Sequence, residues 1–232
     1  MNKYNHNLLS LYVHWPYCET KCPYCDFNSH VNEKINENEW IKSYKNQLLA
    51  IKEELIQNNI NFRHLDTIFF GGGTPSLMPL KIVENIIDIS KKIFGFKKNI
   101  EITLEANPSS YENKKFIKFK QIGINRISIG AQSLNNKYLK FLGRLHNIKD
   151  IEIALNDASE IFDNISVDLI YAFHGQKLHD WTNELENFLN TYNLQHLSLY
   201  QLTIEEGTKF FKDHKNGIIK LIDNDKAAEF YD

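Results

Sequence analysis

Three cysteines carry the most specific chemical signal in this sequence. Cys18, Cys22 and Cys25 are its only cysteines, in a C-x3-C-x2-C arrangement. An odd number of cysteines in one short segment does not form a disulfide framework. Three thiolates can bind three irons of a [4Fe–4S] cluster and leave the fourth iron open to another ligand. The alternatives are a zinc site, which His14 or His30 would complete as the fourth ligand, and three buried thiols without a metal.

A second signal is the run Gly71-Gly72-Gly73-Thr74. Because glycine has no side chain, such a run lets a ligand approach backbone amides and carbonyls closely, and a tight turn is its other use. The run lacks the Lys-Ser/Thr pair of a phosphate-binding loop, which disfavours binding of a nucleoside triphosphate.

Three charged residues are candidates for ligand binding. Asp168 lies between Val167 and Leu169 in an apolar run, so its carboxylate points to the opposite face from theirs. An unpaired buried carboxylate is costly, which indicates a function for Asp168. The guanidinium of Arg144 suits bidentate binding of a carboxylate, with a surface ion pair as the alternative. Glu105 ends a predicted strand, where it either faces a ligand or is simply solvated.

The elements that position these residues alternate between strands and helices. Runs rich in β-forming residues predict strands over residues 8–13, 65–70, 100–105, 125–129, 166–170 and 196–200. Helical periodicity predicts helices near residues 38–58, 80–94, 112–122, 148–162 and 178–192. Strands that each precede a helix imply a parallel sheet with right-handed crossovers.

Two architectures fit this alternation, a β/α barrel and an open doubly wound sheet. Polar and glycine-rich segments follow successive strands, as in a barrel with its site at the carboxyl ends of the strands. We therefore predict an α/β fold with a partial (β/α)6 TIM-like barrel over residues 1–222. A helix that begins near Asp223 and occupies residues 223–232 is predicted to lead into a C-terminal domain that this sequence does not contain.

Composition limits the class of protein. With 232 residues, 42% hydrophobic and 24% charged, the chain is not globally disordered. Lysine and acidic residues are interspersed, which disfavours a nucleic-acid surface, and the basic segment 114–120 is predicted to be a solvated helix face. No apolar run reaches the roughly 20 residues of a membrane span, and the N-terminus does not resemble a signal peptide. We expect a cytoplasmic protein.

Taken together, these segments resemble the radical S-adenosylmethionine (SAM) superfamily. Within it, they are most similar to the oxygen-independent coproporphyrinogen III oxidases and the HemW-type haem chaperones. Beyond the cysteines, the resemblance continues in the family's order through residues 69–77, 101–108, 123–130, 142–146, 166–171 and 197–208.

The resemblance implies a [4Fe–4S] cluster bound by the three cysteines, with the amino and carboxylate groups of SAM on the open iron. In this family Tyr24 would pack against the adenine and Tyr12 would close one side of the site. The residues implied to bind the cofactor are Tyr12, Tyr24, Gly72, Gly73, Thr74, Glu105, Gln132, Arg144 and Asp168.

The resemblance also implies a function. Dedicated oxidases carry a further cysteine shortly after the third ligand, where this sequence has Phe27, so a haem chaperone is favoured. Haem or a porphyrin, an electron donor such as flavodoxin or ferredoxin, and an unknown haem acceptor are the implied partners. The alternatives are a coproporphyrinogen III oxidase and an inactive, C-terminally short relative, so enzyme activity stays open and no catalytic residue is assigned.

One segment departs from the family pattern. Relatives have Leu-Pro-Gly-Gln where this sequence has Phe173-His174-Gly175-Gln176. Replacing proline by His174 removes a fixed φ angle, which puts the local turn in doubt.

Overall fold

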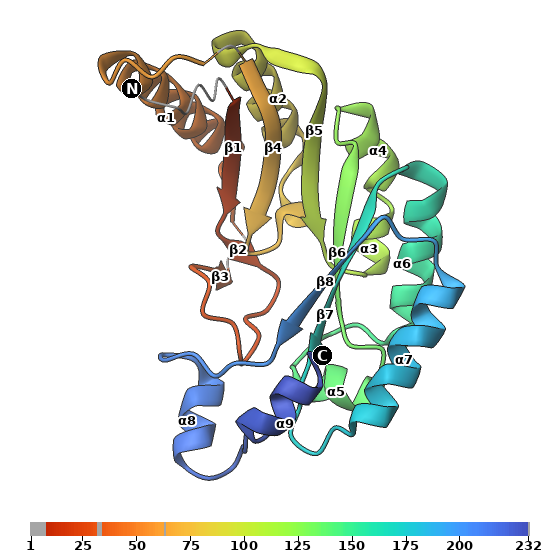
Figure 1. Cartoon of the computed structure of the whole chain (residues 1–232). Helices are drawn as coiled ribbons and strands as arrows, with labels where there is room; N and C mark the ends of the chain where they lie inside the picture. Colours follow the sequence, from red (N-terminus) through yellow and green to blue (C-terminus); the bar gives the residue numbers. More distant parts are fainter. Residues whose placement is uncertain (1–7, 32–33, 63, 232) are drawn as a thin grey trace, which may run out of the picture.

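Six parallel strands form one curved sheet in the computed structural model, which describes residues 8–31, 34–62 and 64–231 (Figure 1). They are β1 (Leu8–Trp15), β4 (His64–Gly72), β5 (Phe96–Ala106), β6 (Arg126–Gln132), β7 (Ile165–Tyr171) and β8 (His196–Gln201). All neighbouring pairs are parallel, and the strands follow one another across the sheet in chain order. A doubly wound sheet reverses its strand order near the middle. The prediction of a partial TIM-like barrel is therefore confirmed, and the doubly wound alternative is wrong.

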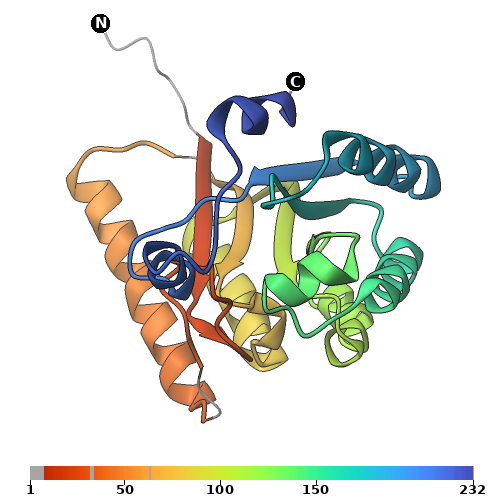
Figure 2. The same cartoon turned by 90° about the horizontal axis from the view of Figure 1, so that it is seen from below.

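The longer helices cover the outer, convex face of the sheet, whereas α8 and α9 lie beyond the carboxyl ends of the strands (Figure 1 and Figure 2). The longer ones are α1 (Glu37–Gln57), α2 (Leu80–Phe94), α6 (Ile148–Ile161) and α7 (Leu178–Thr191). The shorter elements are β2 (Tyr17–Cys18), β3 (His30–Val31), η1 (Pro75–Leu77), α3 (Ser110–Asn113), α4 (Phe116–Gln121), α5 (Asn136–Phe141), α8 (Lys209–Lys215) and α9 (Asn224–Glu229). The concave face is thus left free to bind a ligand.

The hydrophobic core lies between the sheet and these helices. Side chains such as Ile68 and Phe70 of β4 and Ile82 and Ile86 of α2 are almost completely buried. Alternate residues of the strands point to the concave face, and there they are polar, as with Asp168 of β7. The sheet therefore has one apolar face for stability and one polar face for a site.

The helix predicted over residues 112–122 is interrupted. The structure has two short helices there, α3 and α4. The break follows Glu112, whose carboxylate is buried and accepts hydrogen bonds from Ser76 and from the backbone amide of Asn107. In the segment 114–120, Phe116 and Phe119 are buried beneath exposed lysines, so the solvated face is only one side of α4.

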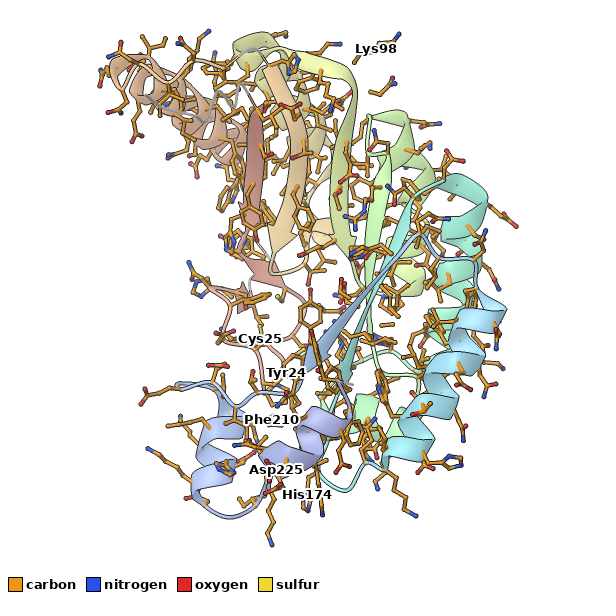
Figure 3. The ribbon with its side chains drawn as sticks, in the orientation of Figure 1. Tyr24, Cys25, Lys98, His174, Phe210 and Asp225 are labelled. Atoms are coloured by element: carbon orange, nitrogen blue, oxygen red, sulfur yellow. The ribbon has the colours of Figure 1, made fainter. Side chains whose placement is uncertain are left out.

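The turn around His174 forms without the proline of the family pattern. Ala172 and Gly175 adopt positive φ angles of 64° and 77°. The side chain of Gln176 accepts from the amide of Phe173 at 3.1 Å, and the Gln176 amide donates to the Phe173 carbonyl at 2.9 Å. These two bonds close the turn, and His174 is exposed at its tip (Figure 3).

Helix α9 begins where the sequence predicts a terminal helix, with Asp223 as its N-cap. Ala227 and Phe230 pack into the main core, and the Phe230 ring stacks on Tyr171 at 6.4 Å between ring centroids. Its assignment as the start of a further domain stays a prediction. Within the described part of the chain, no helix is long and apolar enough to cross a membrane.

Candidate functional site

A cavity of about 650 Å³ opens at the carboxyl ends of the strands. It is bounded by the segment that carries the three cysteines, residues 18–29, here called the cysteine loop, and by residues 71–74, the glycine loop. Every predicted site residue except Tyr12 lines it: Cys18, Cys22, Tyr24, Cys25, Gly72, Gly73, Thr74, Glu105, Gln132, Arg144 and Asp168. The barrel thus brings together residues from almost the whole sequence.

The cysteine loop is closed on itself by backbone and side-chain hydrogen bonds. Strand β2 pairs with β3 through Tyr17 and His30. The Lys21 ammonium donates to the carbonyl oxygens of Phe27 at 3.0 Å and Ser29 at 3.2 Å. The three cysteines are half-buried within this closed loop and line the cavity.

The cysteine sulfurs form a donor set that suits an iron–sulfur cluster. Burial raises the pKa of the Cys25 thiol, the backbone amide of Phe27 opposes this shift, and the neighbouring Cys22 and Cys18 raise the pKa further. The charges of the two neighbouring cysteines therefore oppose ionisation of Cys25, and bound iron would favour its thiolate. In the described residues, no three His, Cys, Asp or Glu side chains converge on one metal-ion position.

The glycine loop packs directly on the first residue of the cysteine loop, Cys18, and on the residues just before it. The amide of Gly73 donates to the carbonyl of Trp15 at 2.6 Å, and the amide of Thr74 donates to the carbonyl of Tyr17 at 2.9 Å. A Cβ atom at Gly73 would lie 2.6 Å from the Tyr17 oxygen and 3.0 Å from the Cys18 sulfur. Gly73 is therefore needed for the close approach of the two loops, beyond any contact with a ligand.

Arg144 reaches the cysteine loop from the turn after α5. Its Nη1 donates to the Cys22 sulfur at 3.4 Å, and its Nη2 donates to the carbonyl of Gly130 at 3.3 Å and to the side-chain oxygen of Asn107. The side chain of Tyr24 also accepts from the guanidinium, so Arg144 has these four partners in place of the surface ion pair considered as an alternative. Gly143, with a φ of 67°, makes this turn possible directly against Pro23.

Asn107 is a site residue that the sequence reasoning did not single out. Its Nδ2 donates to Thr74 Oγ1 at 3.2 Å, and its backbone amide donates to Glu112 at 2.9 Å. It follows Glu105 by two positions and lies one residue past the end of β5, and residues two apart in extended chain share a face. The two-residue spacing from Glu105 is the feature of the sequence that could have identified Asn107 as a site residue.

Glu105 and Asp168 face one another across the cavity. Glu105 accepts a hydrogen bond from the amide of Gly72 at 3.2 Å, and burial, together with the charge of Asp168, raises the pKa of Glu105 to about 7. Burial also raises the pKa of Asp168, and hydrogen bonds from Ser198 and Ser128 oppose that shift. Asp168 therefore points inward, as its position in the apolar strand predicted.

The two tyrosines have different surroundings. Tyr24 lines the cavity and packs against Phe210 of α8, with ring centroids 6.3 Å apart (Figure 3). Tyr12 is 57% exposed and stacks on Phe69 at 6.0 Å. Its hydroxyl lies against Gly71, just outside the cavity lining. A cofactor contact by Tyr12 stays a prediction.

Two further residues shape the floor of the cavity. Gln132 ends β6 with a φ of 69°, a strained conformation of the kind found at functional sites. His146 is buried, and its Nε2 lies 3.1 Å from the carbonyl oxygen of Ala131. Burial and the charge of Arg144 lower the pKa of His146 to about 4, so its imidazole is neutral at pH 7 and donates this hydrogen bond.

The lining is strongly acidic. Among the described residues that form it, Arg144 is the one arginine or lysine, and the acidic members are Glu19, Asp26, Glu105, Glu112, Asp150, Asp168 and Glu205. Such a lining favours a ligand that carries positive charge near the carboxylates.

Comparisons with known proteins show the family of this chain. The model of the radical SAM superfamily matches residues 12–187. The heme chaperone HemW of Buchnera aphidicola subsp. Acyrthosiphon pisum is 41% identical over 95% of this chain and 59% of its own length. Escherichia coli HemW is 37% identical over 87% of this chain and 52% of its own length. A mitochondrial radical S-adenosyl methionine domain-containing protein 1 from Dictyostelium discoideum is 39% identical over 100% of this chain and 56% of its own length.

The solved structures show the same fold. Coproporphyrinogen III oxidase (HemN) of Escherichia coli, a radical SAM enzyme, superposes on 97% of this chain with a TM-score of 0.78 and 24% identity, over 50% of its own chain. The protein anSMEcpe with bound AdoMet superposes on 91% of this chain with a TM-score of 0.58 and 14% identity, over 60% of its own chain. This chain spans about half the length of the curated relatives it matches. The share is 59% for the Buchnera protein, 56% for the Dictyostelium protein and 49% for a bovine relative.

Proposed function

The chain belongs to the radical SAM superfamily, and on this premise we propose that it forms the barrel of a HemW-type haem chaperone. Its cavity would bind a [4Fe–4S] cluster and SAM, and the protein would transfer haem to an acceptor. The observation that carries the cofactor part is the position of three half-buried cysteines at one cavity, with the glycine loop packed on them.

The residues of this chain have distinct tasks in that proposal. Cys18, Cys22 and Cys25 hold the cluster, which when bound supplies the single electron that SAM cleavage requires. The bare backbone of the glycine loop receives the methionine end of SAM. Glu105 and Asp168 stabilise the positive charge of the ligand, because these two strand carboxylates, on β5 and β7, line the cavity.

Two observations favour the chaperone over the oxidase. Relatives that are 37–41% identical carry the name heme chaperone HemW, whereas the oxidase is 24% identical, which supports similarity of fold alone. Coproporphyrinogen carries several carboxylate arms. The acidic lining would repel coproporphyrinogen more strongly than haem, which carries fewer carboxylates, and Arg144 is the one arginine or lysine among the described lining residues.

We also propose a cytoplasmic location and reduction by a small electron carrier such as flavodoxin or ferredoxin. The proposed location is based on the bacterial relatives. The relatives from Dictyostelium, cattle, mouse and zebrafish are, in contrast, named mitochondrial. The haem acceptor would be a further partner.

Anaerobic reconstitution tests the cofactor site. The chain should take up about four irons and show the broad visible absorption of a [4Fe–4S] cluster. A variant with all three cysteines changed to serine should take up none and keep its helical circular dichroism. Zinc bound by the cysteines, with no uptake of iron, would overturn the proposal.

Titration with haem tests the chaperone. The reconstituted chain should bind haem with a change in the Soret absorption, and should then lose it to an apo-haemoprotein. The absence of any spectral change would contradict a haem-binding role for this chain. Formation of 5′-deoxyadenosine together with loss of carboxylates from coproporphyrinogen would support the oxidase instead.

A further inference from the structure

The guanidinium of Arg144 is held on both sides. One terminal nitrogen donates to the sulfur of Cys22, and the other donates to Gly130 and to Asn107. Because a guanidinium is planar and rigid, fixing one nitrogen also fixes the direction in which the other points. The contact with Cys22 therefore depends on what holds the opposite nitrogen.

Asn107 is well suited to hold it. Both ends of its side-chain amide are used, since the oxygen accepts from Arg144 and the nitrogen donates to Thr74 Oγ1 at 3.2 Å. Its backbone amide is bound by Glu112, a buried carboxylate that also accepts from the hydroxyls of Ser76 and Ser109. Asn107 thus has one available orientation, and in it the side-chain oxygen faces Arg144.

We propose that Asn107 is a positioning residue that holds the Arg144 guanidinium on the Cys22 sulfur and thereby raises the reduction potential of the bound cluster. The inference rests on the cofactor proposed above. Reduction adds negative charge to a cluster, so a cationic donor at a ligating sulfur stabilises the reduced form. Without Asn107, Nη2 keeps the Gly130 carbonyl and the guanidinium keeps its contact with Tyr24, but the side chain that Thr74 fixes in place is lost, and the contact with the sulfur is no longer fixed.

Asn107 would be merely structural if its only task were to join β5 to the glycine loop. A structural role and a positioning role differ in what they change. Loss of a structural bond lowers the stability of the fold, whereas loss of positioning changes the potential and does so only while Arg144 is present. A double-mutant cycle between the two residues separates these cases.

The test is a redox titration of the reconstituted chain without SAM, followed by electron paramagnetic resonance. Asn107→Leu removes both side-chain bonds and leaves the backbone amide that Glu112 accepts. We expect about four irons per chain and a midpoint potential shifted to more negative values. Arg144→Met should lower the potential at least as far, and the double variant should show no further shift.

Asn125→Leu is a matched control. Asn125 also makes two side-chain hydrogen bonds, with Ile102 at 2.8 Å and Ile100 at 2.7 Å, but it precedes β6 at the end of the strand opposite the cavity. The midpoint potential of the cluster in Asn125→Leu should equal that in the wild type. An unchanged potential in Asn107→Leu, an equal shift in Asn125→Leu, or additive shifts in the double variant would each overturn the proposal.

Failure of the cofactor proposal looks different, because then the wild-type chain itself would take up no iron. If the wild type takes up iron and Asn107→Leu does not, the variant Asn107→Asp tests the inference instead. An aspartate keeps an oxygen acceptor for Arg144, so this variant should regain a cluster if Asn107 acts through Arg144. Absence of iron in Asn107→Asp as well would overturn the inference.

Discussion

The backbone amide of Phe210 donates a hydrogen bond of 2.9 Å to the carbonyl oxygen of Pro23. It ties the segment after the last strand to the cysteine loop near the start of the chain. The Phe210 ring packs on Tyr24 of that loop, with ring centroids 6.3 Å apart (Figure 3). It also packs on Phe141, with ring centroids 4.8 Å apart. The cysteine loop therefore depends on α8 for its position.

Replacing Phe210 by alanine should destabilise the protein and loosen the cysteine loop. Phe210 is 3% exposed, and loss of a buried phenylalanine costs about 3–5 kcal/mol. Urea unfolding should show this loss, and the cysteines of the apo-protein should react faster with a thiol reagent. Phe211→Ala is the control, because Phe211 is half-exposed and packs against Lys215. Equal thiol reactivity in the two variants would contradict the dependence on α8.

Gly73→Ala should impair binding of the cluster. The added Cβ would lie 2.6 Å from the Tyr17 carbonyl oxygen, so the glycine and cysteine loops must separate. We expect most of the iron to be lost on reconstitution, measured by metal analysis. Gly217→Ala has open space around its Cβ and a φ of 71°, so it should cost about 1–2 kcal/mol of strain without loss of iron. Normal iron content in Gly73→Ala would show that the close approach is dispensable.

Glu105 should make the apo-protein less stable as pH rises. Its pKa is about 7 in the folded state against 4.5 as the ordinary value, so between these values the folded state binds more protons than the unfolded state. The free energy of unfolding should fall by up to about 3 kcal/mol across this window. In Glu105→Gln this contribution should be absent, which urea unfolding at pH 5 and pH 8 would measure. An unchanged pH profile in the variant would contradict the raised pKa.

His146 should make the apo-protein less stable as pH falls, which is the opposite of the effect of Glu105. Its pKa is lowered from 6.5 to about 4, so between these values the unfolded state binds the extra proton. Stability should be lost as pH falls through this window, by up to about 3 kcal/mol. His146→Gln keeps a donor for the Ala131 carbonyl and should remove the slope. Because the two contributions oppose each other, the wild type should vary less between pH 4.5 and pH 6.5 than either variant.

The regular part of the fold follows from the sequence because each strand and long helix carries its own pattern. The six strands of the main sheet and helices α1, α2, α6 and α7 lie where the pattern predicts them. Helices α5 and α8, of six and seven residues, were not predicted from the sequence. A helix this short is marginal alone and forms because one side chain, Leu139 or Phe210, is buried by the rest of the molecule.

The candidate site was predictable only where a residue's chemistry is evident locally. The cysteines, the glycines and the inward carboxylate of Asp168 can be predicted from residue type and spacing. The importance of Asn107 is not evident in this way, because it depends on Arg144, which the fold brings to it from the turn after α5. Tyr12 shows the converse, since a position close to the site in sequence lies outside the cavity lining.

The strand order of the sheet has a consequence for how the protein is made. The cavity combines Cys22, which follows the first strand, with Tyr200 of the last, and strands between them separate the two edges of the sheet. Contacts between residues so far apart in sequence close slowly, because much of the chain must be ordered first. During synthesis the cysteines emerge long before the other walls of their cavity exist. If the chain binds a cluster as proposed, iron delivered to the nascent chain would meet bare thiols, so cluster insertion should follow docking of β8.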